Sequence, residues 1–406
     1  MSSDQKKFGL YIHIPYCAAV CPYCDFAKTA NFTGDVSTAY FNALKRQLEV
    51  WLATSARAGL LKDGISSVFF GGGTPSLFAK ELQPIMQLIE SRLQPGAEVS
   101  LEANPDDLQA EKLAIWRDIG INRVSVGVQT FDAAGLKVLG RTHEGGMAAD
   151  RVAAAMAVIP NLNVDLIYGW PGQTETSWAQ DLSRVVAMGV PHLSLYCLTF
   201  EARTPLGRQA QRGVVKPPLE SPIVAAYEAA RALLHAEGYD HEEVSNWAKA
   251  GYSCTHNWLY WQDQSFIGVG AGAHGYLADP QGPGIRYAYP RNDRLFSKST
   301  VDVGALVDET LDKVASGLGA DIAPDRDMDT WLTELLGSGL RTTRGIDFAA
   351  ALTRCRKKWQ PTLVADEAVK TGSLEFTAGG RLLLRSDEWF REVGWAVEVL
   401  RSCVDI

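Results

Sequence analysis

The stretch that decides the fold reads Leu10-Tyr-Ile-His-Ile-Pro15-Tyr-Cys17-Ala-Ala-Val-Cys21-Pro-Tyr-Cys24. Its first part, Leu10–Ile14, is an apolar run typical of a buried strand, and Pro15 disfavours continuation of that strand. The three cysteines therefore fall on the loop that follows. Because loops at the carboxyl ends of parallel strands carry the chemistry of α/β barrels, the stretch predicts a functional loop.

The cysteines follow the spacing Cys-x-x-x-Cys-x-x-Cys. Thiolates at Cys17, Cys21 and Cys24 can each bind one iron of a 4Fe-4S cluster, which leaves the fourth iron open to a small molecule. A structural zinc site that adds His13 or Asp25 is an alternative, although zinc sites usually present two separate ligand pairs. A disulfide with one spare thiol is a second alternative. The remaining cysteines are scattered along the chain, at Cys197, Cys254, Cys355 and Cys403.

The composition is that of a folded globular protein. The chain has 406 residues, of which 46% are hydrophobic and 21% are charged, and this length predicts two or three domains. The net charge of −8 argues against the broad positive face that nucleic acids require. Met1–Lys7 is polar, and no apolar run is long enough to cross a bilayer. We therefore expect a cytoplasmic protein that is not transmembrane and binds no nucleic acid.

The first half of the chain alternates short β-rich runs with longer helical runs, which is typical of parallel βαβ units. Six strands are predicted, at Leu10–Ile14, Ser67–Phe70, Val99–Glu102, Arg123–Gly127, Asn163–Ile167 and His192–Cys197. Helices are predicted at Thr38–Ala53, Lys80–Arg92, Leu108–Ile119, Thr176–Met188 and Ile223–Ala236. With right-handed crossovers, these units predict an α/β fold with a partial (β/α)6 TIM-like barrel.

Three parts are predicted along the chain. Residues 1–240 form the barrel, and residues 241–296 form an aromatic and glycine-rich connecting segment. Residues 297–406 form a smaller, mostly helical C-terminal domain. Within it, Ser373–Phe376 and Arg381–Leu384 predict a short β-wing hairpin.

Glycines and polar residues stand at or near the ends of several predicted strands. Gly72 and Gly73 allow a close approach of the backbone, so together with Thr74 they can bind a polar ligand through main-chain groups; a tight strand-to-helix turn is the alternative. The other polar residues of this kind are Glu102, Gln129, Arg141 and Asp165. A carboxylate can accept hydrogen bonds from ribose hydroxyls, and an arginine can pair with a carboxylate. Solvated loop residues or ordinary ion pairs are the alternative for each.

A further cluster reads His256-Asn-Trp-Leu-Tyr-Trp261. Histidine is a common axial ligand of haem iron, and tryptophan and tyrosine offer broad surfaces to the face of a porphyrin. A lone histidine beside aromatic residues can also be a packed core residue, which is the alternative interpretation.

These motifs together resemble a known family. The run Tyr11-Ile-His-Ile-Pro-Tyr-Cys17 and the later Gly71-Gly-Gly-Thr-Pro-Ser76 are similar to radical S-adenosylmethionine proteins of the oxygen-independent coproporphyrinogen oxidase family, and further matches cover most of the chain. The resemblance implies that the three cysteines hold a 4Fe-4S cluster whose free iron is chelated by S-adenosylmethionine. By position, it implies S-adenosylmethionine contacts from Tyr11, Gly72, Gly73, Thr74, Glu102, Gln129, Arg141 and Asp165.

Two branches of that family compete. The oxidases carry a longer N-terminal extension and a further cysteine two positions after the third cluster ligand, whereas here only 16 residues precede Cys17 and Phe26 occupies the position of the extra cysteine. The pattern His-Asn-x-x-Tyr-Trp from His256 resembles the haem-binding signature of a haem chaperone branch. The resemblance therefore implies haem near His256, with a haem-acceptor protein and an electron donor as partners. Decarboxylation of coproporphyrinogen III, or radical modification of another small molecule, is the alternative.

Overall fold

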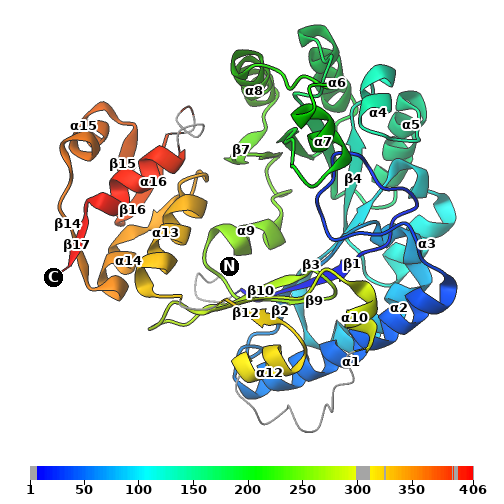
Figure 1. The fold of residues 1–406 in the computed structure, drawn as a ribbon, viewed down its shortest axis with the longest axis horizontal. Coiled ribbons are helices and arrows are strands. Elements are labelled where there is room, and N and C mark those ends of the chain that lie inside the picture. The colour runs from blue at the N-terminus through cyan, green and yellow to red at the C-terminus, as the bar shows by residue number, and fades with distance from the viewer. Residues whose placement is uncertain (1–6, 299–310, 324–325, 386, 388–391, 406) are drawn as a thin grey trace.

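The computed structural model describes residues 7–298, 311–323, 326–385, 387 and 392–405. Its centre is a curved sheet in which six parallel strands follow one another in chain order (Figure 1). These strands are β1 (Gly9–Ile14), β2 (Ile65–Gly72), β3 (Leu93–Ala103), β4 (Arg123–Gln129), β5 (Leu162–Tyr168) and β6 (His192–Cys197). All six predicted strands are confirmed, and with them the partial barrel.

Helices cover the convex outer face of this sheet (Figure 1). They are α1 (Gly34–Arg57), α2 (Ala79–Ile89), α3 (Ala110–Asp118), α4 (Ala133–Val138), α5 (Gly145–Met156), α6 (Glu175–Ala187) and α8 (Glu220–Ala236). Helix α7 (Pro205–Gln211) instead contacts the cysteine loop, where Leu206 N donates to Pro22 O at 2.9 Å. Short 3-10 turns lie at Pro75–Phe78, Glu90–Arg92 and Pro105–Asp107. In α1, Tyr40, Leu44, Leu48 and Trp51 are buried at helical spacing, so one stripe of the helix packs on the sheet. Helices α4 and α5 were not predicted, because both are short and α5 begins with two glycines.

The sheet continues beyond both edges of the barrel to twelve strands in all. At one edge, β9 (Phe266–Val269) runs parallel to β1 and is followed by the antiparallel strands β10 (His274–Leu277), β11 (Ile285–Ala288) and β12 (Asp321–Ile322). At the other edge, β8 (Asn246–Ala248) pairs antiparallel with β6, and β7 (Asp240–Glu243) pairs antiparallel with β8. The predicted connecting segment thus contributes to the main sheet. Its strands have three or four residues, which is too short for a clear alternation of apolar and polar residues.

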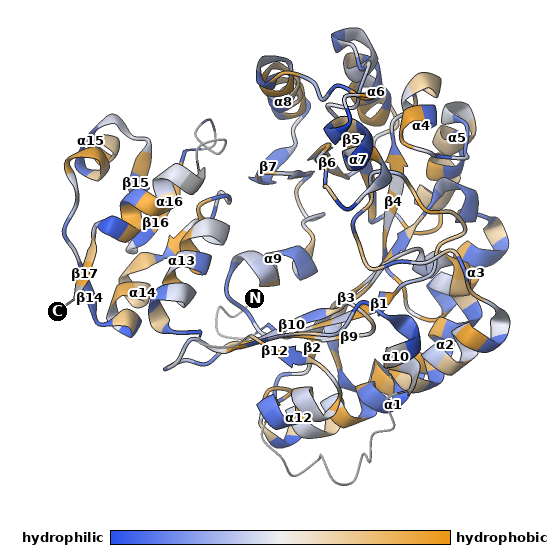
Figure 2. Cartoon of the chain, viewed as in Figure 1, coloured by the Kyte–Doolittle hydropathy of each residue, from blue (hydrophilic) through white to orange (hydrophobic). Residues whose placement is uncertain are grey.

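Two further helices pack on α1, α10 (Asp293–Lys298) and α12 (Leu311–Gly317), and the main core extends through Ala320. The boundary predicted at residues 296 and 297 therefore falls inside the sequence range of this core. A second core begins with α13 (Met328–Gly339) and contains Trp331, Leu336 and Phe348. Both hydrophobic and hydrophilic residues lie on α1 and α13, as expected for helices with one buried face (Figure 2).

The C-terminal domain is built around this second core. Its elements are α13 (Met328–Gly339), β13 (Ile346–Asp347), α14 (Phe348–Cys355), β14 (Lys357–Trp359), α15 (Leu363–Thr371), β15 (Leu374–Phe376), β16 (Arg381–Leu384), α16 (Glu392–Arg401) and β17 (Cys403–Asp405). The predicted β-wing is confirmed as the antiparallel pair β15 and β16, to which β13 adds a third strand. No described helix is both long and apolar enough to cross a bilayer.

Helix α9 (Thr255–Trp261) lies on the concave side of the sheet, between the barrel and the C-terminal domain (Figure 1). It contacts β2 on one side and α13 on the other. The domains are also joined by backbone hydrogen bonds, in which Val244 N donates to Arg341 O at 3.0 Å and Thr343 N donates to Glu242 O at 3.0 Å.

Candidate cofactor site

The cysteine loop folds back on the end of β1. Cys17 N donates to Thr29 O at 3.0 Å, and Thr29 N donates to Pro15 O at 2.7 Å. Cys17 is buried, whereas Cys21 and Cys24 are partly exposed, and the thiols of all seven cysteines are free. Burial raises the pKa of Cys17 to about 11. Metal ligation requires a thiolate, so a bound metal has to displace this proton.

The loop after β2 presses directly against the cysteine loop. Gly73 N donates to Ile14 O at 2.8 Å, and Thr74 N donates to Tyr16 O at 2.8 Å. A Cβ on Gly73 would lie only 2.7 Å from Tyr16 O and 2.8 Å from the Pro15 carbonyl carbon. The contact is thus made by backbone on both sides, and a side chain at position 73 would separate the two loops.

The side chain of His13 links β1 to the cysteine loop. Its Nε2 hydrogen-bonds Ala27 O at 2.7 Å, so Nε2 carries the proton and Nδ1 accepts from the Tyr11 hydroxyl at 2.9 Å. Burial lowers the pKa of His13 to about 4, and the ring is therefore neutral. Both ring nitrogens are engaged, and Asp25 pairs with Arg203 at 2.7 Å, so the two side chains that a zinc site would recruit already have partners.

Arg141 ties three loops together at the carboxyl ends of the strands. Its Nη2 donates to Asn104 Oδ1 at 2.5 Å and to Gly127 O at 2.7 Å, and its Nη1 donates to Cys21 Sγ at 3.5 Å. Asn104 in turn donates to Thr74 Oγ1 at 3.4 Å. The guanidinium thus places a positive charge beside Cys21 Sγ.

Glu102 and Asp165 lie inside the barrel near this edge. Glu102 Oε2 accepts from Gly72 N at 2.9 Å, and burial raises the pKa of Glu102 to about 7, an effect that the Gly72 hydrogen bond opposes and Asp165 increases. Asp165 accepts from Ser125 Oγ at 3.1 Å and from Asn163 Nδ2 at 2.7 Å, and burial raises its pKa as well. Both carboxyl groups can therefore accept hydrogen bonds from a ligand in the barrel.

Gln129 ends β4 in a left-handed conformation, with φ of 70°. This conformation is uncommon for residues other than glycine, asparagine and aspartate. Its side-chain Oε1 is buried and has no hydrogen-bond partner among the described residues. A buried acceptor without a partner costs free energy, so Gln129 is matched to a ligand that donates a hydrogen bond.

The interior of the barrel is polar beyond the predicted residues. Asn163 links Ser125 and Ser194 at 2.7 and 2.9 Å, and Ser194 donates to Asn246 at 2.9 Å. The polar side chains that alternate with buried apolar ones are Glu98, Ser100 and Glu102 on β3, Arg123 and Ser125 on β4, Asn163 and Asp165 on β5, and His192 and Ser194 on β6. This polar lining was not predicted, although polar and apolar residues alternate along the sequences of β3, β4, β5 and β6.

His256 lies at the opposite end of the barrel from the cysteines, beside the first residues of β2. The ring is 0% exposed, its Nδ1 hydrogen-bonds Ser67 Oγ at 2.8 Å and its Nε2 hydrogen-bonds the Tyr260 hydroxyl at 2.9 Å. Burial lowers the pKa of His256 to about 3. This is the arrangement of a packed core histidine, and no ring nitrogen is left to bind haem iron.

Glu98 of β3 caps the N-terminus of α9. Its carboxylate accepts from Thr255 N at 2.9 Å and from His256 N at 3.1 Å, and the Cys254 thiol donates to it at 3.5 Å. These backbone donors have no partner inside the helix, so a carboxylate from the barrel satisfies them. This contact could not be predicted from the sequence, because it joins residues more than 150 positions apart.

We expect Glu98→Ala to lower the free energy of unfolding by about 2–4 kcal/mol, because it leaves buried backbone donors unpaired. Glu98→Gln keeps one acceptor oxygen and should lose less. The check is the denaturation midpoint of both variants, with the exposed Glu111→Ala of α3 as the control. Wild-type stability in Glu98→Ala would show that water replaces the cap.

The fold and this loop of three cysteines define a class of protein. The family description "Radical SAM superfamily" matches residues 11–185. The solved structure of coproporphyrinogen III oxidase (HemN) from Escherichia coli, a radical SAM enzyme, has the same fold, with a TM-score of 0.72 and 20% identity over 97% of this chain and 90% of that one. The chain is a radical SAM protein.

Two curated relatives narrow the class. Heme chaperone HemW of Escherichia coli (strain K12) is 33% identical over 93% of this chain and 96% of its own length. Heme chaperone HemW of Lactococcus lactis is 37% identical over 70% of this chain and 72% of its own length. The chain therefore belongs to the HemW family.

The site fits the cofactors that the superfamily implies. Three thiols share one loop, the Arg141 guanidinium compensates negative charge beside Cys21, and Gln129 Oε1 has no protein donor among the described residues. Within the described residues, no group of three or more His, Cys, Asp or Glu side chains is close enough to hold a single metal ion. A 4Fe-4S cluster binds each cysteine through a different iron, so its ligands need not converge on one point.

Proposed function

We propose that this chain is a haem chaperone that binds haem and transfers it to an acceptor protein in the cytoplasm. The observation that carries the proposal is the match to Heme chaperone HemW of Escherichia coli, which extends over 93% of this chain and so includes the barrel, α9 and the C-terminal domain. The haem-acceptor protein and an electron donor are the partners that this function requires.

We further propose that the chain carries a 4Fe-4S cluster on Cys17, Cys21 and Cys24, and S-adenosylmethionine beside it. When bound, a cluster with one open iron supplies a site that chelates S-adenosylmethionine and delivers one electron to it. The residues proposed to contact S-adenosylmethionine lie within β1 to β5, directly after β2 or, for Arg141, between α4 and α5: Tyr11, Gly72, Gly73, Thr74, Glu102, Gln129, Arg141 and Asp165.

The contacts described above support distinct roles for these residues. Glu102 and Asp165 offer acceptors for ribose hydroxyls, and Gln129 offers an unpaired acceptor for an amino group. Arg141 is held by Asn104 and by Gly127 O, so its position does not depend on a ligand. Gly73 brings the ligand-binding loop against the cysteine loop.

The alternative function is decarboxylation of coproporphyrinogen III. The likeness to the oxidase HemN is 20% in sequence and therefore shows the fold alone. Where the oxidases carry a further cysteine, this chain has Phe26, which is 69% exposed beside the cysteine loop.

A paired assay separates the two functions. Protein with a reconstituted cluster is titrated with haemin and its absorbance followed, and the same preparation is given coproporphyrinogen III with S-adenosylmethionine and a reductant. We expect saturable haemin binding, transfer of the haem to apomyoglobin as a test acceptor, and no decarboxylated product. Absence of saturable binding, or turnover of coproporphyrinogen III, would refute the chaperone function.

The pKa of Glu102 predicts how S-adenosylmethionine binding depends on pH. Its pKa is raised from 4.5 to about 7. The protonated carboxyl group therefore contributes to the stability of the fold below pH 4.5, and this contribution is lost as the pH rises through about 7. A carboxylate is the better acceptor for ribose hydroxyls and attracts the cationic sulfonium. We therefore expect affinity for S-adenosylmethionine to rise about tenfold from one pH unit below this pKa to one unit above it.

Equilibrium dialysis of the cluster-loaded protein measures this dependence. Glu102→Gln cannot ionise and should show a flat profile over the same range. An unchanged slope in the Gln variant would assign the titration to another group.

A further inference from the structure

The cysteine loop presents apolar side chains to solvent. Val20, between the first two cysteines, is 46% exposed, and Phe26, two residues after the third, is 69% exposed. One exposed apolar side chain is ordinary on a protein surface. Here two of them lie on the loop that carries Cys21 and Cys24, which are themselves partly exposed. The loop therefore offers apolar contact area directly beside the proposed cluster.

Two other segments border this loop, one at the start of α7 and one at the start of α10. Arg203, just before α7, pairs through Nη2 with the carboxylate of Asp25 in the loop at 2.7 Å. Arg291, just before α10, lies with its Nη1 3.7 Å from the same carboxylate. A recess of about 340 Å³ lies between the loop and the second segment. Residues 17–29, 201–212 and 291–294 together form what we call the cysteine-loop surface.

The cysteine-loop surface carries more cations than carboxylates. Asp25 is shared by two arginines, and Asp293 accepts from the Tyr16 hydroxyl at 3.2 Å. Within the described part of the chain, no carboxylate forms an ion pair with Arg208 or Arg212. Because the whole chain has a net charge of −8, this surplus of positive charge is local. The exposed or partly exposed cations are Lys28, Arg203, Arg208, Arg212, Arg291 and Arg294, and the carboxylates are Asp25, Glu201 and Asp293.

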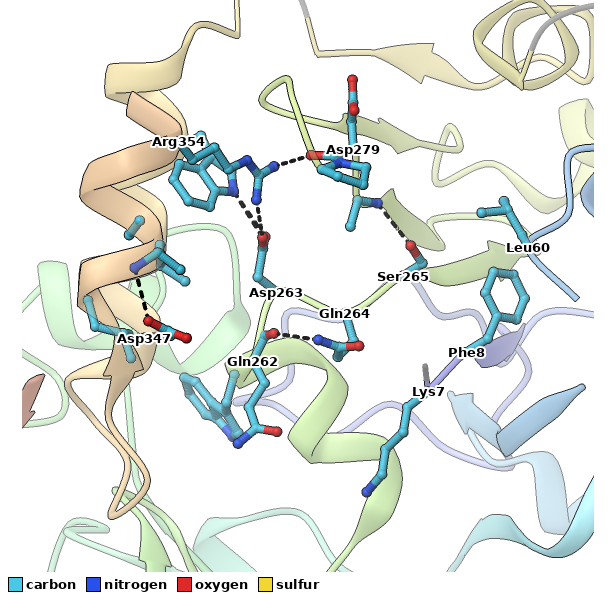
Figure 3. A pocket seen from close by; sticks show the side chains of 18 of the residues that line it. Lys7, Phe8, Leu60, Gln262, Asp263, Gln264, Ser265, Asp279, Asp347 and Arg354 are labelled. Atoms are coloured by element: carbon cyan, nitrogen blue, oxygen red, sulfur yellow. Dashed lines mark hydrogen bonds and ion pairs between the residues drawn. The ribbon is translucent and has the colours of Figure 1, made fainter. Parts of the chain in front are cut away.

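The cavity of about 840 Å³ between the barrel and the C-terminal domain has no such surplus. Figure 3 shows Arg354 directed at Asp263, with which it pairs at 3.1 Å. An acidic partner therefore finds complementary charge at the cysteine-loop surface and not at this cavity. The cations and carboxylates that line the cavity are equal in number: Lys7, Lys62, Arg354 and Arg381 against Asp63, Asp263, Asp279 and Asp347.

We propose that the cysteine-loop surface docks an acidic protein that carries one electron, and that this protein is the donor that reduces the proposed cluster. Phe26 and Val20 form the apolar centre of the contact, and the arginines form its rim, an arrangement typical of protein interfaces. In the transfer the donor loses one electron, the oxidised cluster gains it, and no bond is made or broken. The inference rests on the proposed cluster and names the class of its electron donor.

Charge reversal tests the rim. The probe is oxidised plant-type ferredoxin, an acidic one-electron carrier, and its affinity for the cluster-loaded protein is measured by calorimetry. Arg208→Glu combined with Arg212→Glu should lower this affinity at least tenfold at an ionic strength of about 0.01 M, where the Debye length is about 30 Å. The difference from the wild type should vanish near about 1 M salt, where charges are screened within about 3 Å.

Two controls accompany this test. Arg46→Glu combined with Lys358→Glu reverses the same charge at exposed positions of α1 and β14, and this variant should bind ferredoxin as the wild type does. Cytochrome c, a basic one-electron carrier, should not bind the wild-type protein.

Phe26→Ser tests the apolar centre. We expect wild-type iron content and about tenfold lower affinity for ferredoxin at both low and high salt, because the lost contact is not electrostatic. The rate at which reduced ferredoxin reduces the cluster, followed by stopped-flow absorbance, should fall at least tenfold in Phe26→Ser and in the Arg208 and Arg212 double variant. Photoreduced deazaflavin, a small reductant, should reduce the cluster of both variants at the wild-type rate.

Wild-type affinity for ferredoxin in both variants, or no binding of ferredoxin by the wild-type protein at low salt, would overturn this docking surface. Weaker binding with an unchanged rate of cluster reduction would also overturn it, since the surface would then serve another acidic protein, such as the haem acceptor. The haemin titration needs no reductant, so failure of the chaperone function is distinguishable from failure of this surface.

Discussion

The chain with Cys21→Ala, purified and reconstituted without oxygen, is expected to lack the iron–sulfur absorbance of the wild-type protein. Each of the three cysteines binds one iron in the proposed cluster, and His13 cannot replace a lost ligand, because its two ring nitrogens hydrogen-bond Ala27 O and the Tyr11 hydroxyl. Loss of one ligand exposes two irons and makes the cluster labile. We expect the same result for Cys17→Ala and Cys24→Ala.

Iron and sulfide contents per chain, together with the visible spectrum, measure this effect. Cys355→Ala is the matched control, because this thiol lies in the C-terminal domain and contacts Met328 O at 3.6 Å. Wild-type iron content in any of the three loop variants would remove the basis for the cofactor site. Zinc in place of iron and sulfide would do the same.

Gly73→Ala should have the second largest effect. Its Cβ would lie 2.7 Å from Tyr16 O and 2.9 Å from Tyr16 N, and backbone atoms cannot rotate away. Separation of the two loops should cost about 1–3 kcal/mol of stability, as overpacking of a tight contact usually does. Because these loops would hold both proposed cofactors, we expect affinity for S-adenosylmethionine to fall at least tenfold.

Gly146→Ala is the control for this substitution. Gly146 lies in α5, and a Cβ there would meet nothing within 4 Å. Gly146 is the second residue of α5, and alanine in place of glycine at a compatible position stabilises by about 0.4–1 kcal/mol by restricting the unfolded chain, so this variant should unfold at a slightly higher temperature than the wild type. Equal thermal midpoints and equal S-adenosylmethionine affinities for both variants would contradict the proposed role of Gly73.

The parallel strands could be predicted because each is an apolar run followed by glycine, proline or a polar residue. The same argument brought Glu102, Arg141 and the glycines to one edge of the sheet, where hydrogen bonds now connect Glu102 to Gly72 and Arg141 to Gly127. Parallel strands fix this proximity, because their carboxyl ends share an edge.

The features of the fold and the site that could not be predicted depend on contacts between segments that are far apart in the sequence. The link from Glu98 to the backbone of Thr255 and His256 joins two parts of the chain that carry no common signal. The expected haem contact of His256 rested on residue type, and residue type does not reveal that Ser67 and Tyr260 occupy both ring nitrogens. The left-handed Gln129 is also invisible in the sequence, because glutamine rarely adopts that conformation.

The cap that Glu98 of β3 forms on the N-terminus of α9 also affects the order in which the chain folds. A helix of seven residues is too short to be stable alone in water. Helix α9 therefore needs the Glu98 carboxylate, which is in place only once β3 is paired in the sheet. We therefore expect α9 to form after β3 has paired in the sheet. We expect the contact between α9 and the C-terminal domain to form late in folding. A substitution in β3 that removes the cap should disturb this contact before it unfolds the barrel.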